Sequence, residues 1–194
     1  MDRYVTGACI RKFRERHRMT QEDLAAKIHV SGKAVSKWET GRGFPDISLL
    51  EALAQALNLS VTELLSGNCA QNANKAANML KCKLYVCPVC GNVMQTTGAA
   101  AVSCCGIALP PLEAEPPDDE HEMRVEISED EYFVSVRHPM TKEHYLSFLC
   151  AVADNETRFV KLYPEGPAEA RFPISRVRKV YAYCNRHGLF QLNV

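Results

Sequence analysis

The chain has 194 residues, of which 46% are hydrophobic and 24% charged, as expected for a globular protein with one large domain or two small ones. Its formal net charge is zero, but residues 1–44 carry ten Lys and Arg against five Asp and Glu, whereas residues 113–131 carry ten acids against one arginine. A polyanionic partner is therefore expected for the front half alone. The chain has no apolar run long enough to span a bilayer and no signal peptide, so we expect a cytoplasmic protein without a membrane partner.

Nine cysteines in a reducing compartment indicate metal or redox chemistry rather than a disulfide framework. Taken in chain order, the sequence predicts a multidomain α + β protein. The expected parts are a helical domain at residues 1–66, a linker at 67–81, a small β module at 82–112 and a β-sandwich at 113–194.

Apolar residues recur at helical spacing through residues 1–66, and start and stop signals divide them into five short helices. The patterns Thr20-x-x-Asp23 and Ser60-x-x-Glu63 are typical of capping boxes, in which the first side chain and the last exchange hydrogen bonds with each other's backbone. Gly41 and Gly43 are expected to end the third helix. Val35 and Trp38 are expected to face the core.

A helix that opens at Thr20, a break at His29-Val30-Ser31 and a second helix over Lys33–Glu39 resemble the Cro/CI-type (XRE family) helix-turn-helix, and the resemblance covers residues 7–66. It implies a sequence-specific protein that binds a double-stranded DNA operator as a homodimer, with the second helix in the major groove. By position, the DNA-contacting residues would be Gln21, Ser31, Gly32, Lys33, Ser36, Lys37 and Arg42. The alternative is a small helical bundle whose charges are merely solvated.

Residues 67–78 hold no large apolar side chain and predict a flexible tether or a weak helix. Beyond them, Cys87-Pro88-Val89-Cys90-Gly91 is typical of a metal knuckle, and Cys104-Cys105 supplies two further thiols. Adjacent cysteines can share a metal only if the tetrahedron is locally distorted. Together these motifs resemble desulforedoxin, which implies one non-haem iron in Cys87, Cys90, Cys104 and Cys105, with zinc as the competing metal.

The remaining cysteines before the last motif match no pattern and are expected to be small apolar residues; they are Cys9, Cys69, Cys82 and Cys150. Residues 113–194 then show period-two alternation. Strands are expected around Val125–Ile127, Phe133–Val136, Tyr145–Leu149, Phe159–Tyr163 and Val177–Tyr183. Their length and spacing favour a sandwich.

Two histidine-containing motifs lie within this last part: Arg137-His138-Pro139-Met140-Thr141-Lys142-Glu143-His144, and Tyr183-Cys184-Asn185-Arg186-His187-Gly188. They resemble the superoxide reductase (desulfoferrodoxin) family, which implies an immunoglobulin-like β-sandwich and one iron bound by four histidines and a cysteine. The ligands would be His121, His138, His144, Cys184 and His187, with the imidazoles around the iron, Cys184 below it and a sixth position free. The alternative for His121 is a solvated residue in an acidic loop.

The family usually carries Glu-Lys-His at the first ligand, where this chain has Asp119-Glu120-His121, so the attraction of superoxide should be weaker. The first reading is a transcriptional regulator that senses redox state or an oxygen species through iron. The alternative is a superoxide reductase attached to a DNA-binding domain, which would form hydrogen peroxide without a protein acid, so no catalytic side chain is assigned. A third reading is zinc in the cysteine site beside a vestigial histidine site.

Overall fold

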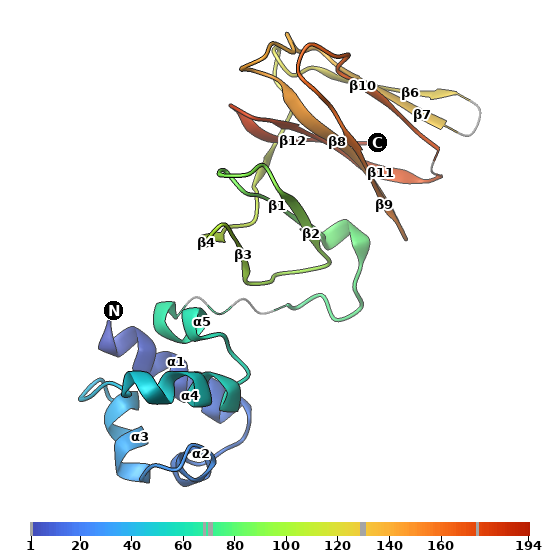
Figure 1. The fold of residues 1–194 in the computed structure, drawn as a ribbon. Helices are drawn as coiled ribbons and strands as arrows, with labels where there is room; N and C mark the ends of the chain where they lie inside the picture. The colour runs from blue at the N-terminus through green and yellow to red at the C-terminus, as the bar shows by residue number, and fades with distance from the viewer. Residues whose placement is uncertain (1, 68, 70–71, 129–130, 174) are drawn as a thin grey trace. The chain divides into compact units, whose positions relative to one another are not determined.

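The computed structural model describes residues 2–67, 69, 72–128, 131–173 and 175–194 (Figure 1). The chain falls into two compact units, Met1–Gln71 and Asn72–Val194, and each is described by itself. Residues 68, 70 and 71, which belong to the expected linker, lie outside the described residues. Over the described ranges, no helix has the length and apolar character needed to cross a membrane.

The first unit contains the helices predicted from the sequence. They are α1 (Arg3–Arg16), α2 (Gln21–Lys27), α3 (Gly32–Glu39), a short 3-10 turn η1 (Ile47–Leu49) that leads into α4 (Leu50–Ala56), and α5 (Val61–Ser66). Both capping boxes form. The side chains of Thr20 and Ser60 each accept from the backbone N–H three residues on, and their own backbone N–H groups donate to the carboxylates of Asp23 and Glu63. The third helix ends at Glu39, and Gly41 follows it in a left-handed conformation with φ 68°. This agrees with the expectation that Gly41 ends the helix.

The core of the helical unit is mostly apolar, but it also contains the buried Thr6 side chain and one ion pair. Val35 and Trp38 of α3 are buried together with side chains from the other helices, as predicted. Beside them the Arg14 guanidinium donates to Glu39 through Nε at 2.6 Å and Nη2 at 3.0 Å. Only 10% of the Arg14 side chain and 2% of the Glu39 side chain are exposed, so this pair joins α1 to α3 inside the unit.

The second unit begins with a small β module. Its elements are a 3-10 turn η2 (Met79–Lys81), the hairpin of β1 (Lys83–Val86) and β2 (Val93–Thr96), and the hairpin of β3 (Val102–Cys104) and β4 (Ile107–Leu109). Tyr85 and Leu109 bury a small core between the hairpins. Leu84 packs instead against Phe148 and Tyr181 of the sandwich, so the module and the sandwich share an apolar contact within this unit.

The sandwich consists of two sheets, in the strand orders β10-β7-β6 and β5-β12-β11-β8-β9 (Figure 1). The strands are β5 (Ala114–Glu115), β6 (Met123–Ser128), β7 (Glu131–Val136), β8 (Leu146–Ala153), β9 (Thr157–Lys161), β10 (Glu169–Phe172), β11 (Val177–Cys184) and β12 (Gly188–Asn193). Apolar side chains from both sheets, among them Val134, Leu149 and Phe172, form one core. All pairings are antiparallel except that of β5 with β12.

The fold class predicted from the sequence is confirmed, and the five predicted strands correspond to β6, β7, β8, β9 and β11. Strands β5, β10 and β12 of the sandwich were not predicted, and β5 has only two residues. Strand β10 has only four residues and ends at Phe172 before a proline, so its period-two pattern is too short to register. In β12, Leu189 and Phe190 are adjacent and both buried, which breaks the alternation expected of a half-buried strand.

Candidate metal centres and nucleic-acid interface

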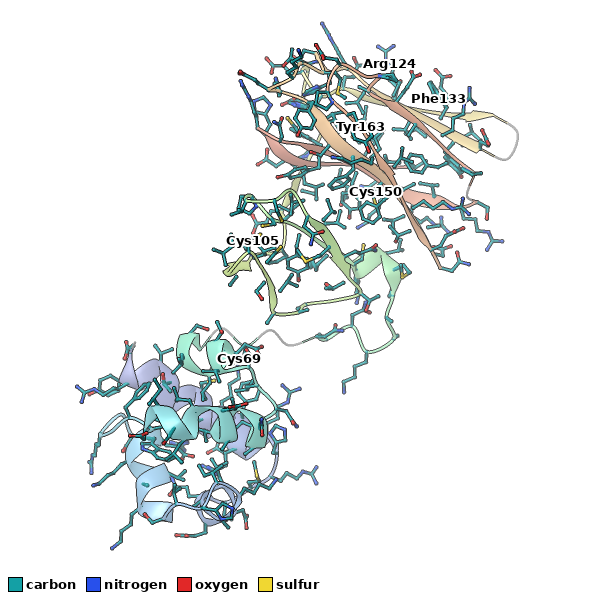
Figure 2. All side chains as sticks on the ribbon, viewed as in Figure 1. Cys69, Cys105, Arg124, Phe133, Cys150 and Tyr163 are labelled. Carbon is teal, nitrogen blue, oxygen red and sulfur yellow. The ribbon has the colours of Figure 1, made fainter. Side chains whose placement is uncertain are left out.

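Four cysteines converge at one end of the β module. Cys87 and Cys90 come from the loop between β1 and β2, and Cys104 and Cys105 from the end of β3; Cys105 is labelled in Figure 2. Their sulfurs all lie within 4.8 Å of one another. The Cys90–Cys104 and Cys104–Cys105 sulfur separations are 3.6 Å and 3.9 Å. Four thiolates about 2.3 Å from one tetrahedral ion lie about 3.8 Å apart, so the quartet fits a single metal.

Left-handed backbone makes this convergence possible. In the first loop Gly91, at φ 69°, closes a turn in which its N–H donates to the Cys87 carbonyl at 2.8 Å. In the second, Cys105 and Gly106 have φ values of 50° and 78° and form the two-residue turn between β3 and β4. Positive φ at both positions is the signature of a type I′ hairpin. The adjacent cysteines can thus face one point because Cys105 takes a left-handed conformation.

The thiols of the quartet perturb one another. The backbone N–H of Cys90 lowers the pKa of Cys87 to about 7, because it hydrogen-bonds the thiolate. The neighbouring Cys90 thiol raises the pKa of Cys105 to about 12, and it also raises the pKa of Cys104. Four thiolates this close repel one another unless a cation neutralises them, which is the chemistry of a tetrathiolate metal site.

The second cluster lies at one end of the sandwich, where both sheets contribute. His121 precedes β6 and His138 follows β7, and these antiparallel strands pair Met123 with Val136 beside them. His144 precedes β8, Cys184 ends β11 opposite Leu146, and His187 lies in the turn to β12. The strand register therefore brings together five side chains that are as many as 66 residues apart.

The donor atoms of four side chains, those of His121, His138, His144 and Cys184, all lie within 4.8 Å of one another, and His187 lies beside two of them. The ring nitrogens Nε2 of His138 and His144 are 3.1 Å apart, and His187 Nδ1 lies 3.2 Å from His121 Nε2. The Cys184 sulfur lies 3.6 Å from His138 Nε2 and 3.8 Å from His187 Nδ1. Two ligands at right angles, each about 2.1 Å from an ion, lie about 3.0 Å apart, so the residues present fit a bound metal.

His121 is held by contacts that the sequence analysis missed. Its side chain is 1% exposed, so it is not the solvated residue of the alternative reading. The Asp118 carboxylate lies 2.7 Å from Nδ1, and the His121 ring stacks on Phe190 with centroids 4.1 Å apart. A carboxylate on the far nitrogen fixes the ring and leaves Nε2 for a metal. The spacing Asp118-x-x-His121 was the available signal, hidden within a run of acids.

The surroundings of His138 and His144 favour the neutral imidazole at both residues. Burial lowers the pKa of His138 to about 4. Burial also lowers the pKa of His144, and the neighbouring His187 adds a smaller effect in the same direction. Neutral imidazole is the form that binds metals. A recess of about 480 Å³ reaches His138 and His144. Its rim carries the acids Asp119 and Glu120 and one arginine, Arg137.

In the helical unit, a tight turn sets α3 against α2. His29 adopts φ 56°, and the N–H of Val30 donates to the carbonyl of Ala25 at 3.0 Å, which closes the C-terminus of α2. Ser31 then caps α3 by accepting from the N–H of Ala34. The break predicted at residues 29–31 is therefore the turn of a helix-turn-helix.

Most predicted DNA-contacting side chains are accessible. Ser31, Lys33, Lys37 and Arg42 are exposed and Ser36 is half-buried. Two of the predicted positions face the protein instead. Gly32 is buried, and a Cβ there would overlap the Glu22 carboxylate. Gln21 is half-buried and its amide donates to Glu39 at 2.8 Å, so the buried ion pair orients it at the start of α2.

The two parts of the chain match different families of known proteins. Residues 10–64 match the family model described as Helix-turn-helix, and residues 109–193 match the model described as Desulfoferrodoxin. The front part is 38% identical over 58 residues to the HTH-type transcriptional activator BcrR of Enterococcus faecalis. That match covers 30% of this chain and 28% of BcrR.

The second unit is similar to proteins matched over nearly their whole length. The chain is 32% identical over 118 residues to the desulfoferrodoxin homolog of Archaeoglobus fulgidus, which covers 56% of this chain and 94% of that protein. In fold it is similar to the superoxide reductase from Treponema pallidum, with a TM-score of 0.52 and 24% identity. That likeness covers 58% of this chain and 98% of the other.

Proposed function

We propose that this chain, which belongs to the desulfoferrodoxin family and carries a helix-turn-helix domain in front, is a transcriptional regulator. It senses redox state or a small oxygen species through iron. The observation that carries the proposal is the covalent union of a helix-turn-helix with two donor clusters, each spaced for one metal. In a regulator of this kind, the oxidation or ligand state of the metal would alter the affinity of the front domain for DNA.

In this proposal the helix α3 reads the operator. Lys33 and Lys37 lie one turn apart on its exposed face, where they can donate to guanine edges or to phosphates. Arg42 lies beyond the end of the helix and would contact the backbone of the duplex. Gln21 would bind a phosphate only if its amide keeps a free N–H beside the bond to Glu39. A homodimer would supply the second half-site.

The second unit would hold one metal in the cysteine quartet and one in the histidine cluster. Iron bound there would supply one-electron redox chemistry, and in the histidine site a place for a small oxygen species. The thiolate of Cys184 would stabilise the oxidised metal, and Asp118 would hold the His121 ring in its ligating orientation. Zinc in the quartet would leave that site structural, because zinc has no redox chemistry.

A second candidate function is superoxide reduction to hydrogen peroxide. It is favoured by family membership and by the recess that opens onto His138 and His144. The charges on its rim oppose it. Asp119 and Glu120 carry two negative charges against one positive charge on Arg137, and a negative entrance slows the encounter with an anion.

One experiment separates these candidates. The full chain is purified with its metals, its metal content is measured, and a duplex selected from a random library is titrated with the oxidised, reduced and chelator-treated forms. The regulator proposal expects the Kd to differ between forms and the His144→Asn variant to lose that difference. A Cys150→Ala variant, altered at a buried cysteine outside both clusters, is the matched control. Equal Kd values for all three forms would overturn sensing, and near-diffusion-limited decay of superoxide in pulse radiolysis would favour the reductase.

A further inference from the structure

Two cysteines that neither metal cluster uses face each other in the helical unit. Cys9 lies in α1, and Cys69, which is labelled in Figure 2, follows α5. Although 60 positions separate them in the sequence, their sulfurs are 3.2 Å apart. A disulfide bond is about 2.05 Å long, so closing this gap requires a movement of about 1.2 Å. The sequence analysis expected both cysteines to be ordinary apolar residues.

The backbone brings Cys69 back over α1. Gly67 ends α5 at φ 70°, its N–H donates to the Glu63 carbonyl at 2.9 Å, and the N–H of Cys69 donates to the Gly67 carbonyl at 3.1 Å. A Cβ on Gly67 would come within 2.5 Å of Val5 Cγ1, so the close approach of this turn to α1 depends on glycine. The juxtaposition of the two sulfurs is therefore set by the main chain.

The two thiols have different surroundings. Cys9 is 5% exposed, and burial together with the neighbouring Cys69 raises its pKa to about 12. Cys69 is only half-buried, so a solvent-borne oxidant reaches its sulfur first. Both sulfurs lie near the Glu63 carbonyl oxygen, at 3.9 Å and 3.8 Å. This asymmetry is typical of a pair in which one thiol reacts with the oxidant and the other resolves the product.

A shared metal does not explain the pair. Across the stretches of chain that the structure describes, the groups of three or more His, Cys, Asp or Glu donors close enough for a metal are the cysteine quartet and the histidine cluster. Cys9 and Cys69 are in neither group. Two thiols without a third donor make a poor metal site but a complete disulfide partnership.

We propose that Cys9 and Cys69 form a reversible disulfide when the protein meets hydrogen peroxide. The Cys69 thiol gives up its proton, and its thiolate attacks one peroxide oxygen; the O–O bond breaks, the departing hydroxide takes up that proton to become water, and Cys69 becomes a sulfenic acid. The Cys9 sulfur then attacks the Cys69 sulfur; the S–S bond forms, the S–O bond breaks, and the departing hydroxide takes the Cys9 proton to become water. Overall, two thiols and one hydrogen peroxide give one disulfide and two waters.

The disulfide would fix the segment that follows α5 to α1. It would join α1 to the residue that follows α5 and close a loop that contains the helix-turn-helix. Restricting the unfolded chain over 60 positions raises Tm, and for a unit of this size we expect a rise on the order of 10 °C. The inference does not rest on either metal site, because hydrogen peroxide added from outside suffices.

The test uses the reduced full chain, once with its purified metals and once refilled with zinc. Each sample is treated with hydrogen peroxide, quenched with catalase, alkylated and digested. We expect a peptide that links Cys9 to Cys69, lighter by two hydrogens than the two free peptides, in both samples. Reduction should restore two alkylated cysteines. Free alkylated thiols at both positions after peroxide, or Cys69 oxidised to sulfinic acid without the link, would overturn the proposal.

Variants separate the link from general oxidation. Cys9→Ser and Cys69→Ser should each abolish the linked peptide and the peroxide-induced rise in Tm of the helical unit, followed by far-ultraviolet circular dichroism. Cys150→Ala, at a buried thiol of the second unit, should keep both effects. If Cys9→Ser misfolds, Cys69→Ser still decides, because Cys69 is half-buried at the edge of the unit. A linked peptide without any rise in Tm would refute the claim that the disulfide stabilises the helical unit.

Discussion

Replacing Glu39 by alanine should cost the helical unit much of its stability. The variant removes the acceptor of two Arg14 N–H groups, at 2.6 Å and 3.0 Å, and of the Gln21 amide at 2.8 Å. Because the Arg14 side chain is 10% exposed, its charge would stay inside the protein without its partner. Breaking a buried pair in this way costs about 3–5 kcal/mol.

Two contacts that remain place the cost at the lower end of that range. Arg14 still donates to the Met19 carbonyl at 2.7 Å and lies 3.6 Å from Glu15. We therefore expect a loss of about 3 kcal/mol, which for a unit of this size lowers Tm by about 12–24 °C. A domain of about 70 residues is stable by about 4–10 kcal/mol, so the loss is a large fraction of the total. The assay is thermal unfolding of the full chain followed by circular dichroism.

Glu15→Ala is the matched control. Glu15 accepts from Arg11 at 2.9 Å, but their side chains are 53% and 65% exposed, so solvent screens the pair and its loss should lower Tm far less than the loss of Glu39 does. Replacing Arg14 and Glu39 together by methionine should recover most of the loss, because it leaves no unpaired charge. The reasoning is refuted if Glu39→Ala lowers Tm no more than Glu15→Ala does.

The remaining predictions concern the metal centres and the operator. Asp118→Asn should weaken metal retention by the histidine site about 10- to 100-fold in a chelator competition, because Asp118 orients a ligand, whereas Asp119→Asn should change it little. Glu120→Lys should raise the rate of reaction with superoxide about threefold at low salt. The substitution changes the charge on the rim of the recess by two units, which act on the superoxide anion across about 10 Å of water. In metal-free protein, His138 has a pKa of about 4, whereas in the unfolded chain its pKa is about 6.5, so between these values only the unfolded chain binds the proton. The free energy of unfolding should therefore decline as pH falls from about 6.5 to about 4, and His138→Gln should flatten that decline. Lys37→Ala should weaken operator binding and reduce its salt slope by about one.

Each of these has a result that would contradict it. Equal metal retention in Asp118→Asn and Asp119→Asn would mean that the carboxylate does not support its ligand. A Glu120→Lys rate that is unchanged or insensitive to salt would remove the electrostatic argument. A wild-type Tm that is constant between pH 6.5 and 4 would refute the argument from His138, and an unchanged salt slope would place Lys37 away from phosphate.

Much of the fold followed from local patterns. Apolar spacing marks the helices of the front unit, and the two capping boxes form where Thr20 and Ser60 predict them. Knuckle motifs also act locally, since Gly91 and Gly106 permit the turns that bring neighbouring thiols together. The resemblances to helix-turn-helix and desulfoferrodoxin proteins, confirmed at the level of family, rested on such short motifs.

The sequence by itself therefore determined the order of the parts, most of their secondary structure and the residue types that could bind a metal or DNA. Only the tertiary structure decided what depends on distant contacts: the burial of His121 on Phe190, the Asp118 carboxylate behind it, the ion pair that holds Gln21, and the approach of Cys69 to Cys9. The physical reason is that periodicity and capping act over a few residues, whereas these contacts are fixed by strand register and helix packing between residues far apart in the chain.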